Sequence, residues 1–292
     1  MGSTSLWRSW GTIAIVTVVA VGCAGSGDDA GSTDSQPSTA ASEESGPLGV
    51  VALGHSALTG ENSDPDRPGE DVPENSWATG TAPEVDSTYQ RLVALRPETR
   101  DRVANQAQGG ADAAALVTQA EAALHTVPTP ELVIIQTIDN DIRCDGTDAE
   151  HVEEFGAAAD ATLDLITAAS PDSRILLVGQ MGRSDPAYIE QLVVEDPTVK
   201  AQLSGTGICD FFDPAGQLVE ANFETLTGII DGYEAEQARV CAAVPRCRTD
   251  DGARAAYVDE LANFSSDWAH LNAPGGTLGH RRSPGPASRL LG

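Results

Sequence analysis

Short, continuously apolar runs alternate along this chain with longer segments in which apolar residues recur every three or four positions. The runs occupy residues 48–53, 132–135 and 174–178, and residues 102–105 form a weaker one. Strands that are apolar on both faces are typical of a parallel sheet covered by helices on both sides. The alternation therefore predicts an α/β domain whose functional loops leave the carboxyl ends of the strands.

The longer segments have the spacing of surface helices with one buried face. They cover residues 86–95, 111–124, 149–168, 217–240 and 252–263, and Asp86 or Ser87 is the expected N-cap of the first. Aromatic residues make up only 4% of the chain. The core must therefore be built from Ala, Val, Leu and Ile.

Residues 1–22 have the features of an export signal. Arg8 precedes an apolar run at 12–21 that is too short to cross a bilayer comfortably. The run ends at Gly22-Cys23, which resembles the processing site of bacterial lipoproteins, where the cysteine becomes the lipidated first residue. We expect Cys23 to be lipidated; the alternative is an ordinary secretory signal followed by an incidental cysteine.

Composition separates three further segments. Residues 23–46 contain almost no large apolar side chain and cannot bury enough surface to offset the entropy of ordering, which predicts a flexible tether. A single folded domain is expected over residues 47–275. Residues 276–292 are basic and rich in Pro and Gly, so they form an atypical tail, for which a change of reading frame is one hypothesis.

The charge of the chain restricts its partners. The sequence has 44 Asp and Glu against 17 Lys and Arg, a formal net charge of −27. Such a surface repels phosphate backbones and anionic headgroups, so a nucleic-acid partner is excluded. Membrane contact is expected only through the lipid anchor.

Four cysteines remain besides Cys23: Cys144, Cys209, Cys241 and Cys247. In the oxidising compartment that export implies, an even number predicts disulfides, and four cysteines allow three connectivities. Cys241 and Cys247 are close enough to close a small loop, which would pair Cys144 with Cys209. No C-x-x-C pair is present, so no zinc or other metal site is expected.

Residues that can perform acyl transfer follow the predicted strands. Ser56 follows the first strand, and Asp267 and His270 lie near the end of the chain, three positions apart. A serine hydroxyl becomes a useful nucleophile when an imidazole takes its proton, and a carboxylate fixes the tautomer of that imidazole. This spacing lets Asp267 reach one ring nitrogen of His270 while the other faces Ser56.

The developing oxyanion requires fixed hydrogen-bond donors, each worth about 3–4 kcal/mol of barrier. The backbone N–H groups of Ser56 and Gly110 and the side-chain amide of Asn140 follow three different strands. We predict these three as the oxyanion hole.

Four short segments, which contain Ser56, Gly110, Asn140 and the pair Asp267 and His270, follow one another along the chain. In this order they resemble the conserved blocks of the SGNH hydrolases, also called GDSL esterases and lipases. The blocks carry the serine (Ser56), an oxyanion glycine (Gly110), an oxyanion asparagine (Asn140) and a D-x-x-H pair (Asp267 and His270). The resemblance covers residues 49–272. It implies a three-layer α/β/α, flavodoxin-like fold with about five parallel strands.

The sequence departs from that family pattern in three places. His55 replaces the usual aspartate before the serine, and Ile138 replaces the usual glycine before Asn140. Family members usually end with a further helix, where this chain has the atypical tail. We expect a structural or loop-supporting role for His55. The nucleophile elbow of α/β-hydrolases is excluded because position 58 is leucine rather than glycine.

The resemblance implies a serine esterase that hydrolyses carboxylic esters through an acyl-serine intermediate, without metal or organic cofactor. The expected protein is a monomer, lipid-anchored to the outer face of the cell membrane. Its substrate is a small-molecule, lipid or glycan ester, and the sequence does not separate a simple esterase from a lysophospholipase or a carbohydrate deacetylase. The alternative is a catalytically inactive lipoprotein that binds a glycan or a partner.

Overall fold

The computed structural model describes residues 46–275, so the predicted signal peptide, Cys23, most of the tether and the tail lie outside the described residues. Five parallel strands form one sheet in the order β2-β1-β3-β4-β5. They are β1 (Val50–Gly54), β2 (Val103–Asn105), β3 (Leu132–Gln136), β4 (Arg174–Leu177) and β5 (Cys247–Thr249). This is the strand order of flavodoxin-like sheets, and the predicted fold class is confirmed.

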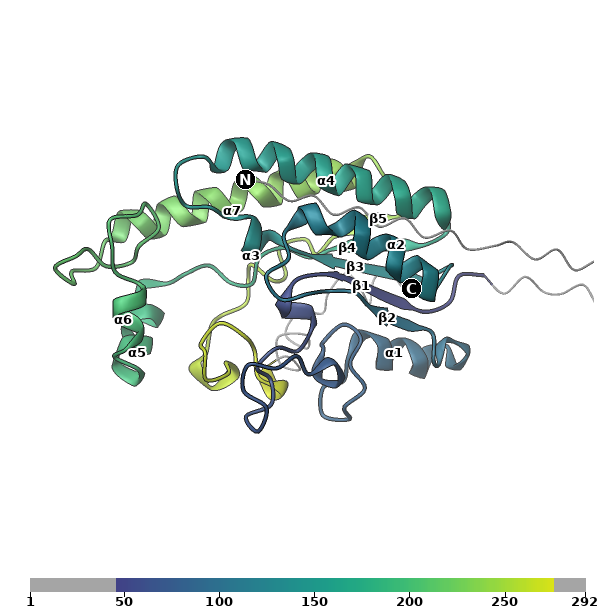
Figure 1. The fold of residues 1–292 in the computed structure, drawn as a ribbon, viewed down its shortest axis with the longest axis horizontal. Helices are drawn as coiled ribbons and strands as arrows, with labels where there is room; N and C mark the ends of the chain where they lie inside the picture. The colour runs from purple at the N-terminus through teal and green to yellow at the C-terminus, as the bar shows by residue number, and fades with distance from the viewer. Residues whose placement is uncertain (1–45, 276–292) are drawn as a thin grey trace, which may run out of the picture. The chain divides into compact units, whose positions relative to one another are not determined.

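Helices cover both faces of the sheet, as Figure 1 shows: α2, α4 and α7 lie over one face and α1 under the other. The helices are α1 (Thr88–Leu95), α2 (Leu116–Thr126), α3 (Ile138–Asp141), α4 (Asp148–Ala169), α5 (Pro186–Glu195), α6 (Val199–Gln202) and α7 (Glu220–Ala242). Ser87 caps α1 by accepting a hydrogen bond from the backbone of Gln90, as its position predicts. No helix between residues 46 and 275 is long and apolar enough to cross a membrane.

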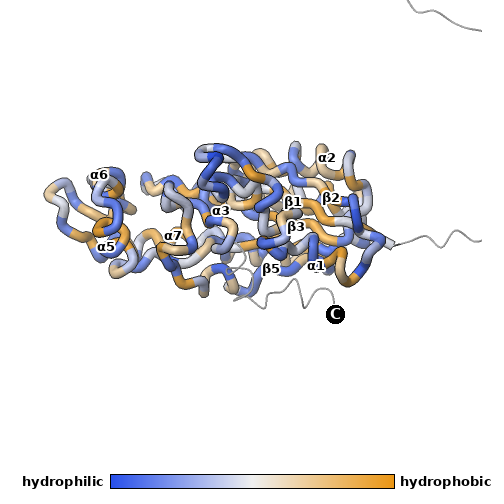
Figure 2. The backbone as a smooth tube through the Cα atoms, turned by 90° about the horizontal axis from the view of Figure 1, so that it is seen from below, coloured by the Kyte–Doolittle hydropathy of each residue, from blue (hydrophilic) through white to orange (hydrophobic). Residues whose placement is uncertain are grey.

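The core consists of two apolar layers separated by the sheet. Alternate strand residues such as Val51 and Ile135 pack against α2, α4 and α7, and their neighbours such as Ala52 and Ile134 face α1. Figure 2 shows the apolar strands at the centre of the domain. The strands are apolar on both faces because each face is buried against helices or loops.

Both predicted disulfides are confirmed. Cys144–Cys209 joins the chain before α4 to the segment between α6 and α7, and Cys241–Cys247 joins α7 to β5. A third apolar cluster, which includes Ile189, Phe212 and Phe223, lies around α5 and α6. Figure 1 shows these two helices to one side of the sheet, beyond the carboxyl ends of the strands.

One expected helix is absent. Residues 252–263 form turns followed by an extended segment, and only the short 3-10 helix Leu261–Asn263 is helical there. The chain turns at Asp251 and Gly252, which have positive φ angles of 52° and 74°. The Asp250 carboxylate then accepts the backbone N–H of Arg254. These side-chain and tertiary hydrogen bonds replace the helical ones that the apolar spacing suggested.

Candidate active site

Ser56 is held at the carboxyl end of β1. The strand ends at Gly54, whose φ of +137° suits glycine and where a Cβ atom would overlap the carbonyl oxygen of Gln136 on β3. Gly54 also donates its N–H to the buried side chain of Gln119 on α2. The chain therefore turns sharply after β1 and presents Ser56 as the first residue of a 3-10 helix, Ser56–Leu58.

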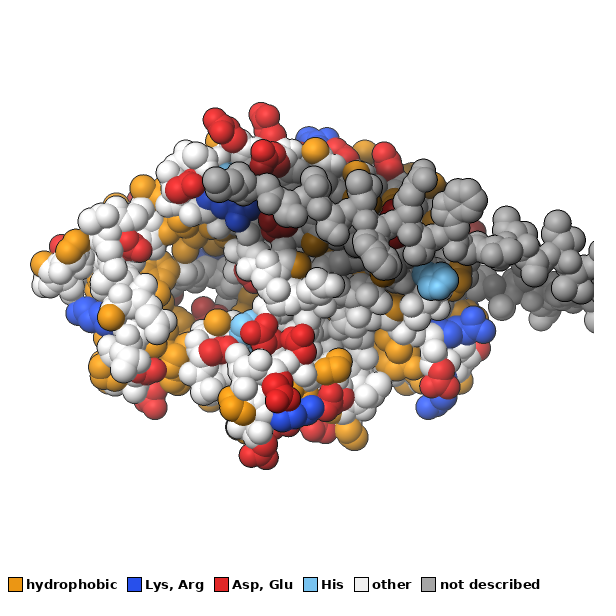
Figure 3. Space-filling view, viewed as in Figure 1, with side chains coloured by type: hydrophobic (Ala, Val, Ile, Leu, Met, Phe, Trp, Pro, Cys, Tyr) orange, Lys and Arg blue, Asp and Glu red, His pale blue; other side chains and the backbone are white. Residues whose placement is uncertain are grey.

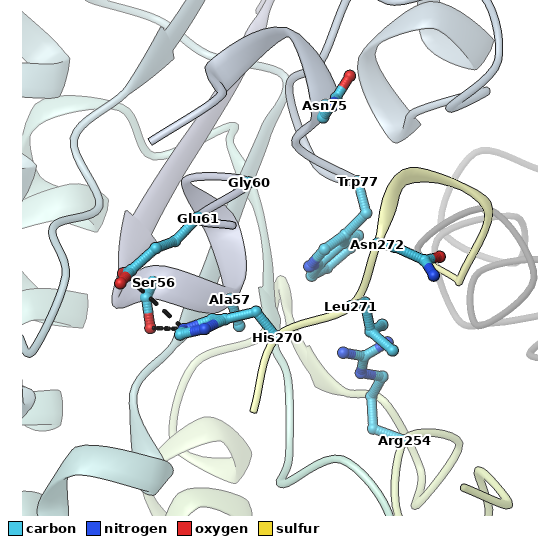
Figure 4. A pocket seen from close by; sticks show the side chains of 10 residues that line it. All are labelled: Ser56, Ala57, Gly60, Glu61, Asn75, Trp77, Arg254, His270, Leu271 and Asn272. Carbon is cyan, nitrogen blue, oxygen red and sulfur yellow. Dashed lines mark hydrogen bonds and ion pairs between the residues drawn. The ribbon is translucent and has the colours of Figure 1, made fainter. Parts of the chain in front are cut away.

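Ser56, His270 and Asp267 form a continuous hydrogen-bonded chain. The Nε2 atom of His270 lies 2.8 Å from Ser56 Oγ, and its Nδ1 atom lies 2.7 Å from Asp267 Oδ2. Figure 4 shows the imidazole pointing at the serine hydroxyl. With Nδ1 donating to the carboxylate, Nε2 is the acceptor that can take the serine proton.

The loop that carries Asp267 and His270 is held by hydrogen bonds between its own backbone and the Asp267 side chain. Asp267 Oδ1 accepts the backbone N–H groups of Ala269 and His270 at 3.0 and 3.1 Å, and Trp268, which directly follows Asp267, has a φ of +58°. The side chain of Asn62 donates to the other carboxylate oxygen. Burial acts to raise the pKa of Asp267, but the hydrogen bonds from His270 and the backbone outweigh it and lower that pKa. The carboxylate stays ionised beside the imidazole.

His55 lies beneath the serine rather than in place of the base. It is 2% exposed, its Nδ1 accepts the backbone N–H of Ala57 at 3.2 Å, and its Nε2 lies 3.1 Å from Asp139 Oδ2. Burial lowers the pKa of His55, which favours its neutral form. These contacts support the predicted loop-supporting role for His55, and they bring the loops after β1 and β3 together.

Gly110 lies in the loop after β2, and Asn140 lies in the short helix α3 after β3. Gly110 has a φ of +74°, and the Asn140 side chain donates to the carbonyl of Ala111 at 3.1 Å, which ties the loop after β3 to the loop after β2. A Cβ on Gly109 would lie 3.0 Å from Glu61, whose carboxylate is 3.8 Å from His270 Nε2. The glycine loop therefore borders the site, while the donor roles of Gly110 and Asn140 stay predictions.

A small pocket of about 40 Å³ opens beside the serine. It is lined by Ser56, Ala57, Gly60, Glu61, Asn75, Trp77, Arg254, His270, Leu271 and Asn272 (Figure 4). Trp77 both packs in the core under the sheet and lines this pocket. Glu61 and Arg254 were not predicted as site residues, because no catalytic block assigns a role to Glu61 and the segment around Arg254 was expected to be a helix.

Within residues 46–275, no group of three His, Cys, Asp or Glu side chains is arranged to hold a metal ion.

Comparison with known proteins relates this arrangement to solved structures. No family model matches the chain, and no curated protein matches it in sequence. A protein of Parabacteroides merdae described as GDSL-like lipase is 15% identical, with a TM-score of 0.51 over 84% of this chain and 97% of that one. The chain has the SGNH/GDSL hydrolase fold.

Two further solved structures to which the chain is similar are named as lipases. The lipase Lip_vut3 from a goat rumen metagenome is 13% identical, with a TM-score of 0.49 over 81% of this chain and 97% of that one. An extracellular lipase of Streptomyces rimosus is 17% identical, with a TM-score of 0.47 over 81% and 97% of the two chains. At these identities the SGNH/GDSL likeness concerns the fold, and activity is argued from the site.

Proposed function

We propose that this chain is a serine esterase that hydrolyses carboxylic esters through an acyl-Ser56 intermediate. The observation that carries the proposal is the hydrogen-bonded chain from Asp267 through His270 to Ser56, which ends at a pocket. The SGNH/GDSL fold supports the proposal. A nucleophile, a base and a carboxylate that orients the base are the set that acyl transfer requires.

The reaction follows from these positions. Ser56 Oγ attacks the ester carbonyl while His270 Nε2 takes its proton, and Asp267 stabilises the resulting imidazolium. The oxyanion is held by the predicted donors Ser56 N–H, Gly110 N–H and Asn140. Its collapse expels the alcohol, which receives the proton from His270. Water, activated by the same imidazole, then hydrolyses the acyl-serine and releases the acid.

The direct test is hydrolysis of p-nitrophenyl acetate and butyrate by the full chain. We expect Ser56→Ala to lose at least about 10³-fold in kcat, the scale of removing a triad nucleophile. Ser184→Ala, at a half-buried serine away from the pocket, is the matched control and should retain activity. A fluorophosphonate probe should label the wild type and the control but not Ser56→Ala.

The second candidate is an inactive surface lipoprotein that binds a glycan or a partner. His55 and Ile138, both buried, replace family residues next to Ser56 and two positions before Asn140, and these departures favour it. A protein that is folded by circular dichroism, hydrolyses neither ester and resists the fluorophosphonate would replace the esterase proposal with this one.

We further propose that the enzyme acts at the cell surface, anchored by lipid on Cys23. The two disulfides support an oxidising compartment. The wild type expressed in a bacterial host should partition into the detergent phase of Triton X-114, and Cys23→Ser should move to the aqueous phase. Equal partitioning of the two proteins would reject the anchor.

A further inference from the structure

The pocket contains a buried cation on the side away from Ser56. Arg254 is 8% exposed and is the only buried Lys or Arg among residues 46–275. Its guanidinium carbon lies 5.5 Å from the centroid of the Trp77 ring. Figure 4 shows Arg254 and Trp77 across the pocket from the serine and Glu61.

No carboxylate of the described residues lies within 4 Å of this guanidinium, and Asp139, Asp250 and Asp259 act on its charge only from farther away. Other arginines of the domain, such as Arg96 and Arg183, form ion pairs with carboxylates, whereas Arg254 forms none within 4 Å. Its Nε is buried without a hydrogen-bond partner. An arginine stays charged even when buried, and a buried charge without a partner is costly. What Arg254 lacks is an acceptor at hydrogen-bonding distance, a place that an anion in the pocket can fill.

The backbone fixes Arg254 in this place. Its N–H donates to the Asp250 carboxylate at 2.8 Å, and its carbonyl accepts from Gly182 and Tyr257 at 2.8 and 3.0 Å. These bonds, together with the contact to Trp77, keep the side chain at the pocket wall. A fixed guanidinium beside an aromatic ring binds planar oxyanions with little loss of conformational entropy.

The other end of the pocket has the opposite charge. Glu61 Oε2 lies 3.8 Å from His270 Nε2, so the carboxylate stands beside the reacting groups and repels an anion there. The space inside the pocket is about 40 Å³, enough for a few water-sized groups of roughly 10–15 Å³ each, so the distance from Ser56 to Arg254 suits a short chain. A short substrate is thus oriented with its ester at Ser56 and its charge at Arg254.

Building on the esterase activity, we propose that Arg254 selects short esters that carry a carboxylate or phosphate group a few atoms from the scissile bond. The charged group can belong to the acyl part or to the alcohol part of the ester. A neutral ester of the same length leaves the guanidinium unpaired and reacts more slowly.

The kinetic test compares charged esters with neutral partners of the same shape. Monomethyl succinate carries the anion on the acyl side and its isomer 3-acetoxypropionate on the alcohol side; the corresponding amides are neutral. We expect the full chain to prefer the anionic member of at least one pair by about 10- to 100-fold in kcat/KM, the size of a charge-assisted hydrogen bond. The pair that shows the preference identifies the side.

For each variant we compare the kcat/KM of the anionic ester with that of its neutral partner. Arg254→Met should reduce the ratio of anionic to neutral turnover to about one or below, and Arg254→Lys should retain part of it, because lysine keeps the charge but not the fork. Arg248→Met, at an exposed arginine on β5, is the matched control and should keep the wild-type ratio. A ratio near one or below for both pairs in the wild type would overturn the proposal.

Binding separates this inference from the esterase proposal. Calorimetry on full-length Ser56→Ala should detect succinate at least about 10-fold more tightly than succinamide, a difference lost when Arg254→Met is added. Anion binding without hydrolysis of any ester supports the Arg254 site and rejects the esterase. Ester hydrolysis with neither a preference for anionic esters nor binding of succinate supports the esterase and rejects the Arg254 site.

Discussion

At the scale of single residues, Asp267 determines which nitrogen of His270 faces the serine. Its carboxylate accepts from His270 Nδ1, from two backbone N–H groups and from Asn62. Every one of these partners is a donor, so the position requires a group that only accepts. An ionised carboxylate satisfies this requirement and an amide does not.

Asp267→Asn tests this dependence. The amide can keep the backbone contacts through its oxygen, but its NH₂ group then faces Nδ1 and favours the tautomer that carries a proton on Nε2. That tautomer cannot take the proton of Ser56, and we expect kcat to fall by about 10³- to 10⁴-fold. His125→Ala, at an exposed histidine on α2, should leave kcat unchanged. A loss below tenfold for Asp267→Asn would show that the base does not need the carboxylate.

Gly54 and Gly228 offer a matched pair at the same scale. A Cβ at Gly54 would overlap the carbonyl of Gln136, whereas one at Gly228 on α7 meets nothing within 4 Å. We expect Gly54→Ala to lower the free energy of unfolding by more than about 4 kcal/mol, or to prevent folding. Gly228→Ala should raise it by about 0.5–1 kcal/mol, because alanine loses less entropy in a helix. Denaturant titration measures both, and similar effects at the two positions would contradict the structure.

At the scale of elements, the region around α5 and α6 is attached to the domain by a disulfide and a small apolar cluster. Cys144 and Cys209 are 65 positions apart, and Trp268, next to Asp267, donates to Asp196 at the end of α5 at 3.2 Å. The loop with the catalytic acid therefore touches this region. The region around α5 and α6 is held in place by the Cys144–Cys209 disulfide as well as by packing.

The two disulfides should contribute different amounts to the free energy of unfolding. A bridge that closes a loop of 65 positions restricts the unfolded chain more than one that closes 6. Replacing Cys144 and Cys209 together by alanine should cost roughly 4 kcal/mol, against about 2 kcal/mol for Cys241 and Cys247. Urea unfolding of both double variants measures the difference, and a larger cost for the short loop would contradict the entropic account.

A buried carboxyl on α3 makes the stability depend on pH. Asp141 accepts the backbone N–H of Ala113, and burial raises its pKa to about 6. A pKa that is higher in the folded chain favours folding at low pH, and this contribution is lost as the pH rises through about 6.

The unfolding free energy of Asp141→Asn minus that of the wild type should therefore increase with pH. We expect this difference to grow by about 2 kcal/mol from about pH 4.5 to about pH 8. The exposed Asp145, whose pKa is lowered by the hydrogen bonds from Thr147, provides the control: Asp145→Asn should show no such gain. A difference that stays constant with pH would mean that Asp141 is not desolvated. Chemical denaturation at each pH gives the values.

At the scale of the whole molecule, negative charge dominates the surface. The formal net charge is −27, and Figure 3 shows acidic side chains spread over the face in view. Self-repulsion of this kind destabilises a compact chain and weakens as salt screens it.

Raising sodium chloride from about 20 mM to about 500 mM at pH 7.5 should therefore raise Tm by several degrees. The same addition near the sequence pI of about 4.2 should raise it much less, because the net charge is then close to zero. An equal rise at both pH values would indicate a general salt effect instead of screening.

Local pattern was enough for the main elements. The strands at 132–135 and 174–178 and the helices at 149–168 and 217–240 lie within two or three residues of the observed bounds. A buried apolar run or a helix of about 20 residues has a strong local preference, whereas the weaker pattern at 252–263 was overridden by tertiary hydrogen bonds. The three-residue strand β5 and the helices α5 and α6 were not predicted, because short elements depend on their neighbours rather than on their own residues.

The sequence by itself determined the α/β class through apolar periodicity, and the short Cys241–Cys247 loop through cysteine spacing, which left Cys144 to pair with Cys209. It determined Asp267 and His270 through D-x-x-H, and Ser56 through the order of the four blocks along the chain. Only the tertiary structure decided what surrounds Ser56. Glu61 and Trp77 come from the long connection between β1 and α1, and Arg254 comes from the segment after β5, near the other end of the domain. Their burial and their charge environment depend on how those loops pack, and no local pattern records that packing.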